Sequence, residues 1–335
     1  MNKILIHRRI HTATLLIQRN GHPCREAAAG GMTADTPFYL ASVSKLYTHA
    51  ILFRLLDTGQ LHLDTCLTDI LAPDITRHFP HAAHITVRHL LDHTSGLPNH
   101  ETDRDSAGHT LLDELLRRDR RIEFADILAR QAQLPARIPG GHKAHYADLN
   151  TLLLGKMAEN VSGKDADALL HEHICQPLAL VHTRWAREDD TAAPIHNGDA
   201  IIACRQYLAS QGYPGGIIAP NRELMRFARA FFAGQLFRTE HLHVSPFRPM
   251  QHYPLRYGNG MMQLTLAKPV SWFFGGAREI RGHSGISGSF AFYCPEKDTI
   301  ITGSLNQLRL RPYPLIFRAI HIHHKNPKNN HFLPS

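Results

Sequence analysis

The chain has few cysteines and no pattern that would pair them. Its 335 residues include five cysteines, an odd number, and none stands in a C-x-x-C pair. A disulfide scaffold is built from an even set of cysteines, and a zinc ribbon from paired C-x-x-C motifs. The sequence argues against both, and no cysteine lies in a context typical of a nucleophile. The five are Cys24, Cys66, Cys175, Cys204 and Cys294.

Long hydrophobic runs are also missing. Residues 1–21 carry basic side chains but no apolar segment long enough for a signal peptide. No other segment approaches the roughly 20 apolar residues that a membrane-spanning helix requires. We therefore expect a soluble cytoplasmic protein without a membrane span. If the natural protein begins further upstream, an export signal there would place it in the periplasm or outside the cell.

Acidic residues are fewer than basic ones, which leaves a formal net charge of +8. The excess is spread along the chain apart from four arginines within residues 117–121, which we interpret as the exposed face of a helix. Nucleic-acid binding would require a recognised motif or a basic stripe with aromatic residues, and neither is present. The expected partner is a small-molecule or peptide substrate, and the sequence sets no oligomeric state.

Hydrophobic periodicity divides the chain into sheet-forming ends and a helical middle. The predicted strands are 12–18, 24–30, 257–266, 270–274, 288–294 and 298–305. The predicted helices include 85–92, 111–118, 124–133, 148–161, 164–175, 221–233 and 313–321. We expect an α/β region from residues 1–60 and 215–325, an inserted all-helical region at 61–214, and a disordered tail at 326–335.

One tetrad, Ser42-Val43-Ser44-Lys45, begins an apolar-periodic helix that Gly59 closes. Residues three apart share a helix face, so Lys45 can take the proton of the Ser42 hydroxyl. A serine needs such a base to become a nucleophile. The helix N-terminus adds positive potential and a free N–H where an oxyanion would form. The same spacing arises by chance in a chain this long, so the presence of other catalytic groups must decide whether the tetrad is a catalytic motif.

Two further segments are candidates for those partners. Tyr146 follows a Pro-Gly-Gly turn and opens the helix predicted at 148–161. Its phenol can point into a cleft, and a nearby ammonium that lowers its pKa would let it shuttle protons. Residues 282–285, Gly-His-Ser-Gly, lie beside a strand where small residues let a substrate approach, with His283 at the mouth of the cleft. The alternatives are a half-buried tyrosine and a surface histidine, in a chain with 26 histidines.

In this order and at these separations, the three segments resemble the serine β-lactamase and penicillin-binding protein superfamily. The similar branch is the class C-like one, which also holds D,D-carboxypeptidases, D-aminopeptidases and esterases. The resemblance covers roughly residues 12–310. It extends to residues 37–41, 85–97, 150–155, 215–216 and 294–296.

This resemblance implies a β-lactamase-like α/β fold, in which helices flank an antiparallel sheet built from both chain ends. It implies that Ser42 is the acylated nucleophile and that Lys45 is its general-base partner. Tyr146 would relay the proton to the leaving group. The resemblance implies no cofactor.

Substrate-binding groups are implied as well. The backbone N–H groups of Ser42 and of Ile286, on the edge strand, would form the oxyanion hole. His283-Ser284-Gly285 occupies the place where β-lactamases usually carry Lys-Thr-Gly. Asn306 lies near the position where the family lines the distal part of its site.

Two positions depart from the family pattern. Asp148 stands where many members have asparagine, and an ionised carboxylate only accepts hydrogen bonds. Its charge would favour protonated Lys45, which makes Tyr146 a better base or implies a protonated Asp148. The base therefore stays open between Lys45 and Tyr146. At His283, a neutral imidazole holds a substrate carboxylate poorly near pH 7, whereas lysine is permanently charged.

These residues predict a serine hydrolase that forms an acyl-enzyme on an ester or on a D-amino-acid amide or peptide. It would be an esterase or a D,D-peptidase-like enzyme with weak or no β-lactamase activity. A β-lactamase proper and a catalytically inactive, ligand-binding relative are the alternatives. Substrate recognition is expected from the loops near 98–110, 185–212 and 236–256.

No metal is expected. His89 and His93 stand four residues apart, a spacing that can bind zinc. No glutamate follows His89 to act as the base of a zinc peptidase, so we interpret both histidines as structural.

Overall fold

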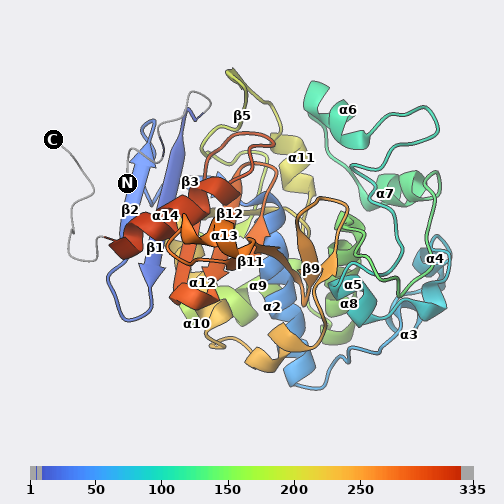
Figure 1. Ribbon diagram of the computed structural model, residues 1–335. Helices are drawn as coiled ribbons and strands as arrows, with labels where there is room; N and C mark the ends of the chain where they lie inside the picture. The colour runs from blue at the N-terminus through green and yellow to red at the C-terminus, as the bar shows by residue number, and fades with distance from the viewer. Residues whose placement is uncertain (1–4, 6–9, 326–335) are drawn as a thin grey trace.

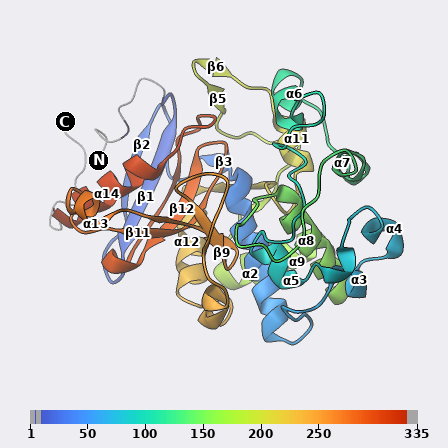
Figure 2. The same ribbon diagram turned by 45° about the vertical axis from the view of Figure 1, so that its right-hand side comes forward.

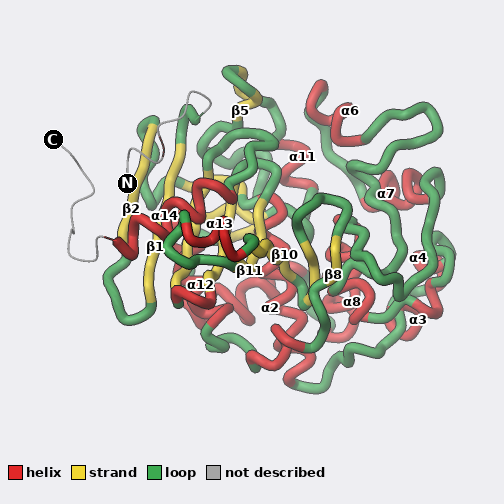
Figure 3. The backbone as a smooth tube through the Cα atoms, viewed as in Figure 1, coloured by secondary structure: helices red, strands yellow, loops and turns green. Residues whose placement is uncertain are grey.

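The computed structural model describes Leu5 and residues 10–325, and its largest element is an eight-stranded antiparallel sheet (Figures 1 and 3). Both chain ends contribute strands, so the predicted sheet is confirmed. In spatial order the strands are β2 (Arg25–Ala29), β1 (Ala13–Arg19), β13 (Thr299–Ser304), β12 (Ser289–Cys294), β11 (Glu279–Ser284), β10 (Met261–Thr265), β9 (Arg256–Gly258) and β8 (Arg248–Pro249). The predicted tail, 326–335, lies outside the described residues.

Helices cover both faces of this sheet, and the strands are apolar on both faces as a result. On β1, Leu15 and Ile17 pack in the cluster that includes helix α14 (Tyr313–Lys325), whereas Leu16 faces Met225 of α12 (Asn221–Phe232). Successive side chains of a strand point to opposite faces. Burial on both sides explains why β1 appears in the sequence as a continuous apolar run.

Most of the other helices lie on the far side of α2 (Ser44–Asp57) from β1 and β2, as Figure 2 shows, whereas α10 (Gln176–Leu178) lies against α12. Those beyond α2 are α3 (Leu67–Ile70), α4 (Pro73–Thr76), α5 (Val87–Leu91), α6 (Leu111–Arg117), α7 (Phe124–Gln131), α8 (Asp148–Ser162), α9 (Ala166–Leu170) and α11 (Arg205–Ser210). A π-turn, His171–Cys175, joins α9 to α10. Most of α2 is buried, because it lies between the sheet and these helices.

The helical middle also contains short strands. Three strands form a small sheet in the order β3 (Pro37–Tyr39), β7 (Ile217–Pro220) and β4 (Arg184–Trp185). A two-stranded ribbon joins β5 (His196–Asn197) to β6 (Ala200–Ile201). The division of the chain into 1–60 with 215–325 and 61–214 stays a prediction.

Three details of the predicted strands were wrong or incomplete. The expected strand at 270–274 is instead the end of helix α13 (Lys268–Trp272) and the turn after it, because Pro269 in the first turn favours a helix start. The run 257–266 is two strands, since Asn259 and Gly260 both have positive φ and form a tight hairpin turn. Strand β11 was not predicted, because its charged residues obscure the alternation of apolar and polar side chains that is typical of a strand.

Candidate active site

Ser42 lies in the short 3-10 turn η1 (Ala41–Val43), immediately before α2. Lys45 is in the first turn of α2, and its Nζ lies 3.3 Å from the Ser42 Oγ. Ser42 lines a cavity of about 550 Å³, whereas Lys45 is completely buried behind it. The helical spacing therefore brings the hydroxyl and the amine together as the sequence predicts.

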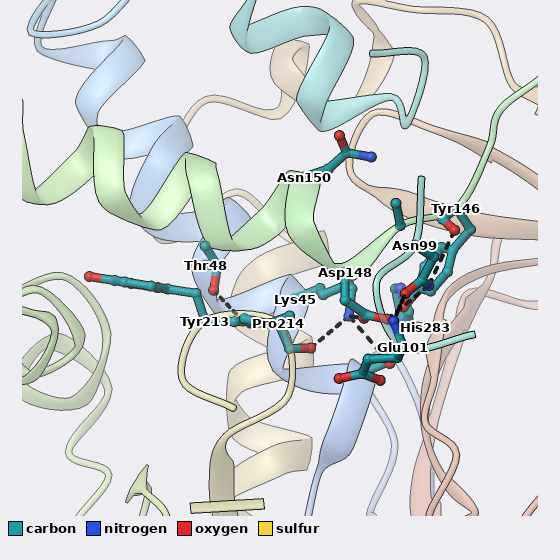
Figure 4. A network of polar contacts seen from close by, with 12 residues as sticks. Lys45, Thr48, Asn99, Glu101, Tyr146, Asp148, Asn150, Tyr213, Pro214 and His283 are labelled. Carbon is teal, nitrogen blue, oxygen red and sulfur yellow. Dashed lines mark hydrogen bonds and ion pairs between the residues drawn. The ribbon is translucent and has the colours of Figure 1, made fainter. Parts of the chain in front are cut away.

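The Lys45 ammonium donates to two further acceptors (Figure 4). Its Nζ lies 2.5 Å from Asp148 Oδ1 at the start of α8 and 2.7 Å from the Pro214 carbonyl. Asp148 Oδ2 accepts from the Asn99 side chain at 3.0 Å. Burial alone would raise the pKa of Asp148, but the charge and hydrogen bond of Lys45 hold that pKa below its usual value. Lys45 and Asp148 therefore form a buried ion pair.

The segment 213–216 reaches Lys45 because α8 leaves room for it. A Cβ on Gly155 would lie 2.1 Å from the Tyr213 ring, so only glycine lets that ring pack against the helix. The Tyr213 carbonyl accepts from Thr48 at 2.9 Å, one turn after Lys45 on α2. These contacts place the next carbonyl, that of Pro214, on the Lys45 ammonium.

Tyr146 lies beside the nucleophile as predicted, but its titration differs from our expectation. Its ring centroid is 5.1 Å from Lys45 Nζ, and Tyr146 lines the same cavity as Ser42. Burial, followed by the charge of Asp148, raises the pKa of the phenol well above 10. The expected lowering of this pKa by Lys45 is wrong, because burial and then the Asp148 charge raise it. The resting phenol is protonated and suited to donate.

His93 fixes the start of α8, which carries Asp148. Its Nδ1 accepts from the Ala147 N–H at 3.0 Å and lies 2.8 Å from Asn150 Nδ2. Its ring stacks on Tyr146 at 4.7 Å. His89 uses Nδ1 near the Thr86 N–H at 3.2 Å. Both histidines thus hold backbone in place, which agrees with a structural interpretation.

His283 is not at the mouth of the cavity, where we expected it. It is completely buried, and its ring lies 5.8 Å from that of Tyr257. Burial, and then the Lys45 charge, lower its pKa well below 6.5, so the imidazole is neutral. Because side chains alternate along β11, its neighbour Ser284 faces the cavity instead, with its Oγ 2.9 Å from the Tyr313 hydroxyl.

The turn after β11 contacts the nucleophile segment closely. A Cβ on Gly285 would lie 2.7 Å from the Leu40 carbonyl, so a larger residue would push the two apart. The same carbonyl accepts from Ser289 Oγ at 2.5 Å, and the Tyr39 carbonyl accepts from Ser287 Oγ at 3.0 Å. These bonds clamp the nucleophile segment to the end of the sheet.

Ile286 lies in that turn and not on an edge strand, because β11 ends at Ser284 and has β10 and β12 on its two sides. Ile286 and Ser42 both line the cavity. Within the described part of the chain, the Ile286 N–H donates no hydrogen bond. The turn therefore leaves this group free to bind a substrate oxygen.

Asn306 lies outside the cavity lining. Its Nδ2 contacts Thr12 Oγ1 at 3.1 Å and Met32 Sδ at 2.8 Å, and its Oδ1 accepts from Ser304 at 2.7 Å. The residue is buried and adopts φ 43°. Asn306 thus ties the end of β13 to Thr12 and Met32 of the same chain. The expectation that it lines the distal part of the site is therefore wrong.

Glu101, a buried carboxyl that lines the cavity, is a candidate functional residue that the sequence motifs did not indicate. Burial, and then the charge of Asp148, raise its pKa to about 8. Its Oε1 has no hydrogen-bond partner among the described residues and lies 3.8 Å from Nε2 of His100, which is buried with a pKa lowered to about 4. The one signal was the polar run 99–103, which directly follows the family-like stretch 85–97.

Three arginines, Arg104, Arg309 and Arg311, also line the cavity. Arg309 pairs with Asp113 at 3.0 Å, and Arg104 donates to the Gly108 carbonyl. Arg311 is exposed and forms no hydrogen bond or ion pair with any described residue. The cavity therefore has one acidic end beside Asp148 and a basic rim.

Two comparisons place the chain among known sequences. The family model described as beta-lactamase matches residues 2–324. Penicillin-binding protein 4 of Amycolatopsis lactamdurans is 30% identical over 149 residues, which are 44% of this chain and 36% of that protein. D-alanyl-D-alanine-carboxypeptidase/endopeptidase AmpH of Escherichia coli K12 is 26% identical over 205 residues, which are 61% of this chain and 51% of that protein. The matches span about half or less of these relatives.

Solved structures share the fold over nearly the whole chain. A D-stereospecific amidohydrolase from Streptomyces sp. has a TM-score of 0.75 at 24% identity, covering 92% of this chain and 93% of that one. The D-amino acid amidase of Ochrobactrum anthropi SV3 has a TM-score of 0.77 at 20% identity, covering 97% of this chain and 99% of that one. The family match, the shared fold and the Ser42–Lys45–Tyr146 cluster agree, and the chain belongs to the beta-lactamase family.

Proposed function

We propose that this protein is a serine hydrolase that cleaves amides or esters of D-amino acids with a free α-amino group. Glu101 is the observation that carries this proposal. Its carboxyl lines the same cavity as Ser42 and has one oxygen without a partner. A buried acceptor without a partner costs free energy until a donor arrives. A substrate ammonium group supplies both the donor and the opposite charge.

Electrostatics in the cavity favour that substrate. The Lys45 charge is already balanced by Asp148, and His100, 3.8 Å from Glu101, is neutral because its pKa is lowered to about 4, so Glu101 has no charged partner among the described residues. A bound ammonium would lower the Glu101 pKa from about 8, and the carboxyl would ionise against it. A neutral acyl ester offers no such charge. The named activities of the Streptomyces and Ochrobactrum enzymes support the D configuration.

In the proposed reaction, Ser42 Oγ attacks the substrate carbonyl carbon while the Ile286 and Ser42 N–H groups hold the oxyanion. Lys45 transfers one proton to Asp148 across their 2.5 Å contact and then accepts the Ser42 proton. The Tyr146 phenol protonates the leaving amine or alcohol, and Lys45 returns a proton to Tyr146. Water then cleaves the acyl-enzyme by the reverse route, which frees Ser42 and the acid.

The arginine rim favours a second candidate, a D,D-carboxypeptidase. The unpaired guanidinium of Arg311 suits a terminal carboxylate on the leaving group. The carboxypeptidase name of AmpH supports this reading. Rapid β-lactam turnover is not expected, since His283 is neutral and buried where β-lactamases carry lysine.

A substrate panel tests the proposal. It contains D- and L-phenylalanine amide, N-acetyl-D-phenylalanine amide, an acyl-D-Ala-D-Ala peptide, p-nitrophenyl acetate and nitrocefin. We expect the kcat/KM of D-phenylalanine amide to be roughly 100-fold higher than that of its N-acetyl form. Acetylation removes the ammonium, and its contact with Glu101 should stabilise the transition state by about 3 kcal/mol. Ser42→Ala should abolish all turnover and labelling by a fluorophosphonate probe.

Glu101→Gln is the discriminating variant. It should lose most of the preference for the free amine yet keep turnover of p-nitrophenyl acetate, which has no ammonium. Glu240→Gln, on an exposed glutamate, is the matched control. Equal cleavage of the free and acetylated amides would overturn the ammonium proposal, and fast nitrocefin turnover would favour a β-lactamase. A folded protein that reacts with nothing in the panel and leaves Ser42 unlabelled would favour a binding protein.

A further inference from the structure

Helix α13, between β10 and β11, presents large apolar side chains to solvent. Val270, Trp272 and Phe273 are 44%, 74% and 79% exposed. The segment itself is anchored, since the Phe274 ring packs at 5.7 Å on Phe317 of α14 and Ala277 is buried. Two adjacent exposed aromatic residues on an anchored helix are unusual for a soluble surface. With Phe273 directly after the end of α13, they form a small exposed apolar patch, called the tip below.

Basic side chains surround this tip. Lys268 begins α13, and the Lys297 ammonium would lie 3.9 Å from a Cβ on Gly276. Burial, followed by positive charge from Lys325 and Lys297, lowers the pKa of His321, which faces Gly275. Arg19, at the end of β1, lies near Lys297 on the same side of the molecule, because after burial both charges lower the pKa of His324.

The nearest acidic groups are engaged by the protein. Glu296 Oε2 accepts from the Glu279 N–H at 3.3 Å, and Asp298 Oδ1 accepts from the Tyr293 hydroxyl at 3.1 Å. The positive field around the tip is therefore only partly offset.

We propose that this α13 surface, made of Val270, Trp272 and Phe273 with the basic residues around them, docks the protein on an anionic lipid bilayer. Aromatic rings at the headgroup level combined with lysine or arginine clusters are what such surfaces bind. A second protein is a poorer fit, because the surface of three apolar residues is far smaller than the roughly 1,200 Å² that a stable protein–protein interface buries. No helix in the described part of the chain is long and apolar enough to span a bilayer, so docking is peripheral.

Docking at α13 leaves the cavity accessible. Tyr313, the first residue of α14, lines the cavity, whereas His321 near the other end faces the α13 surface. Eight residues of helix separate them, about 12 Å at 1.5 Å per residue. Figure 1 shows α13 and α14 together on the outside of the sheet. Lipid binding and turnover of a soluble ester can therefore be measured independently.

Vesicle binding tests the proposal on the full chain. We expect the protein to co-sediment with vesicles that contain phosphatidylglycerol and not with pure phosphatidylcholine vesicles. Trp272→Ser with Phe273→Ser should weaken this binding roughly tenfold or more. Lys297→Gln with Lys325→Gln should weaken it at low salt, and about 1 M salt should do the same to the wild type, since the Debye length is then about 3 Å. Val181→Ser with Ile201→Ser, at comparably exposed sites, should change nothing.

Tryptophan fluorescence gives a second measurement, because the chain contains only Trp185 and Trp272. Brominated phosphatidylglycerol should quench the wild type but not Trp272→Ser. Unchanged p-nitrophenyl acetate turnover shows that each variant is folded. Binding by the double serine variant equal to wild type would overturn the proposal. So would a concentration-dependent dimer that this variant abolishes, which would assign the surface to a second copy of the chain.

Discussion

Two groups of charged residues at the cavity differ in how their charges are satisfied. Lys45 and Asp148, which we propose perform the chemistry, are buried, paired at 2.5 Å, and held by Asn99 and the Pro214 carbonyl. Glu101 and Arg311, which we propose bind the substrate, are left open: Glu101 has an oxygen without a hydrogen-bond partner, and Arg311 has no ion pair, among the described residues. The protein thus pairs the first group and leaves the second incomplete.

This difference has a physical basis. A buried charge must be paired or it neutralises, so the resting Lys45–Asp148 ion pair can hold its geometry without a substrate. Glu101 stays protonated near neutral pH because burial and then the charge of Asp148 raise its pKa to about 8. The ion pair should therefore fail when one partner is removed, and binding at Glu101 should respond to pH and to substrate charge.

The largest effect is expected from Lys45→Met. The variant leaves the Asp148 carboxylate buried without its cation, which should lower the free energy of unfolding by about 3 kcal/mol. Loss of the proton carrier should reduce kcat/KM by about 1,000-fold or more. Urea unfolding and D-phenylalanine amide hydrolysis measure the two effects. Lys156→Met, at a partly exposed lysine paired with Glu159, should change little.

The double variant Lys45→Met with Asp148→Leu sharpens this prediction. Removing both charges should restore most of the lost stability and none of the activity. Activity that returned with stability would contradict a chemical role for the ion pair.

An intermediate effect is expected from pH. Folding raises the Glu101 pKa from about 4.5 to about 8, so the folded state binds the proton more tightly than the unfolded state. This contribution to stability is complete below about pH 4.5 and is lost as pH rises toward 8. Urea unfolding should show Glu101→Gln gaining stability relative to wild type, on the order of 4 kcal/mol, between about pH 5 and pH 8. A difference that does not change with pH would show that Glu101 is already ionised in the empty cavity.

The smallest effect is expected from Arg311→Gln. The guanidinium is exposed, and exposed charge pairs contribute at most about 1 kcal/mol. KM for an acyl-D-Ala-D-Ala peptide should therefore rise about fivefold, with no change for D-phenylalanine amide. Arg278→Gln, an exposed arginine outside the cavity lining, is the control. Equal effects on both substrates would show that Arg311 does not bind the terminal carboxylate of the peptide.

Local spacing explains why part of the site was predictable. Ser42 and Lys45 are one helical turn apart, so their contact needs only a helix. The family-like stretch 85–97 and Tyr146 were recognisable as motifs in the printed sequence. The sheet from both chain ends followed from short strand-like apolar runs near the two termini. In each case the information lies within a few residues or in a repeated pattern.

Local sequence patterns failed mainly to predict which side chains are buried and which are exposed. His283 and Ser284 are neighbours, and only the placement of β11 between β10 and β12 decides which of them faces the cavity. The apolar run 270–274 suggested a strand because hydrophobicity usually means burial, whereas Trp272 and Phe273 are exposed. Asn306 stands close in sequence to the cavity residue Arg309 yet points toward β1.

Short-range spacing and motif order in the sequence were enough to predict the family and to single out Ser42, Lys45 and Tyr146 as candidate catalytic residues. Tertiary structure alone decided which groups are charged. The approach of Asp148 makes Lys45 an ion-pair partner, and burial keeps Tyr146 protonated, His283 neutral and Glu101 protonated. The physical reason is that a pKa depends on solvent exclusion and on charges from distant segments, which no local pattern contains.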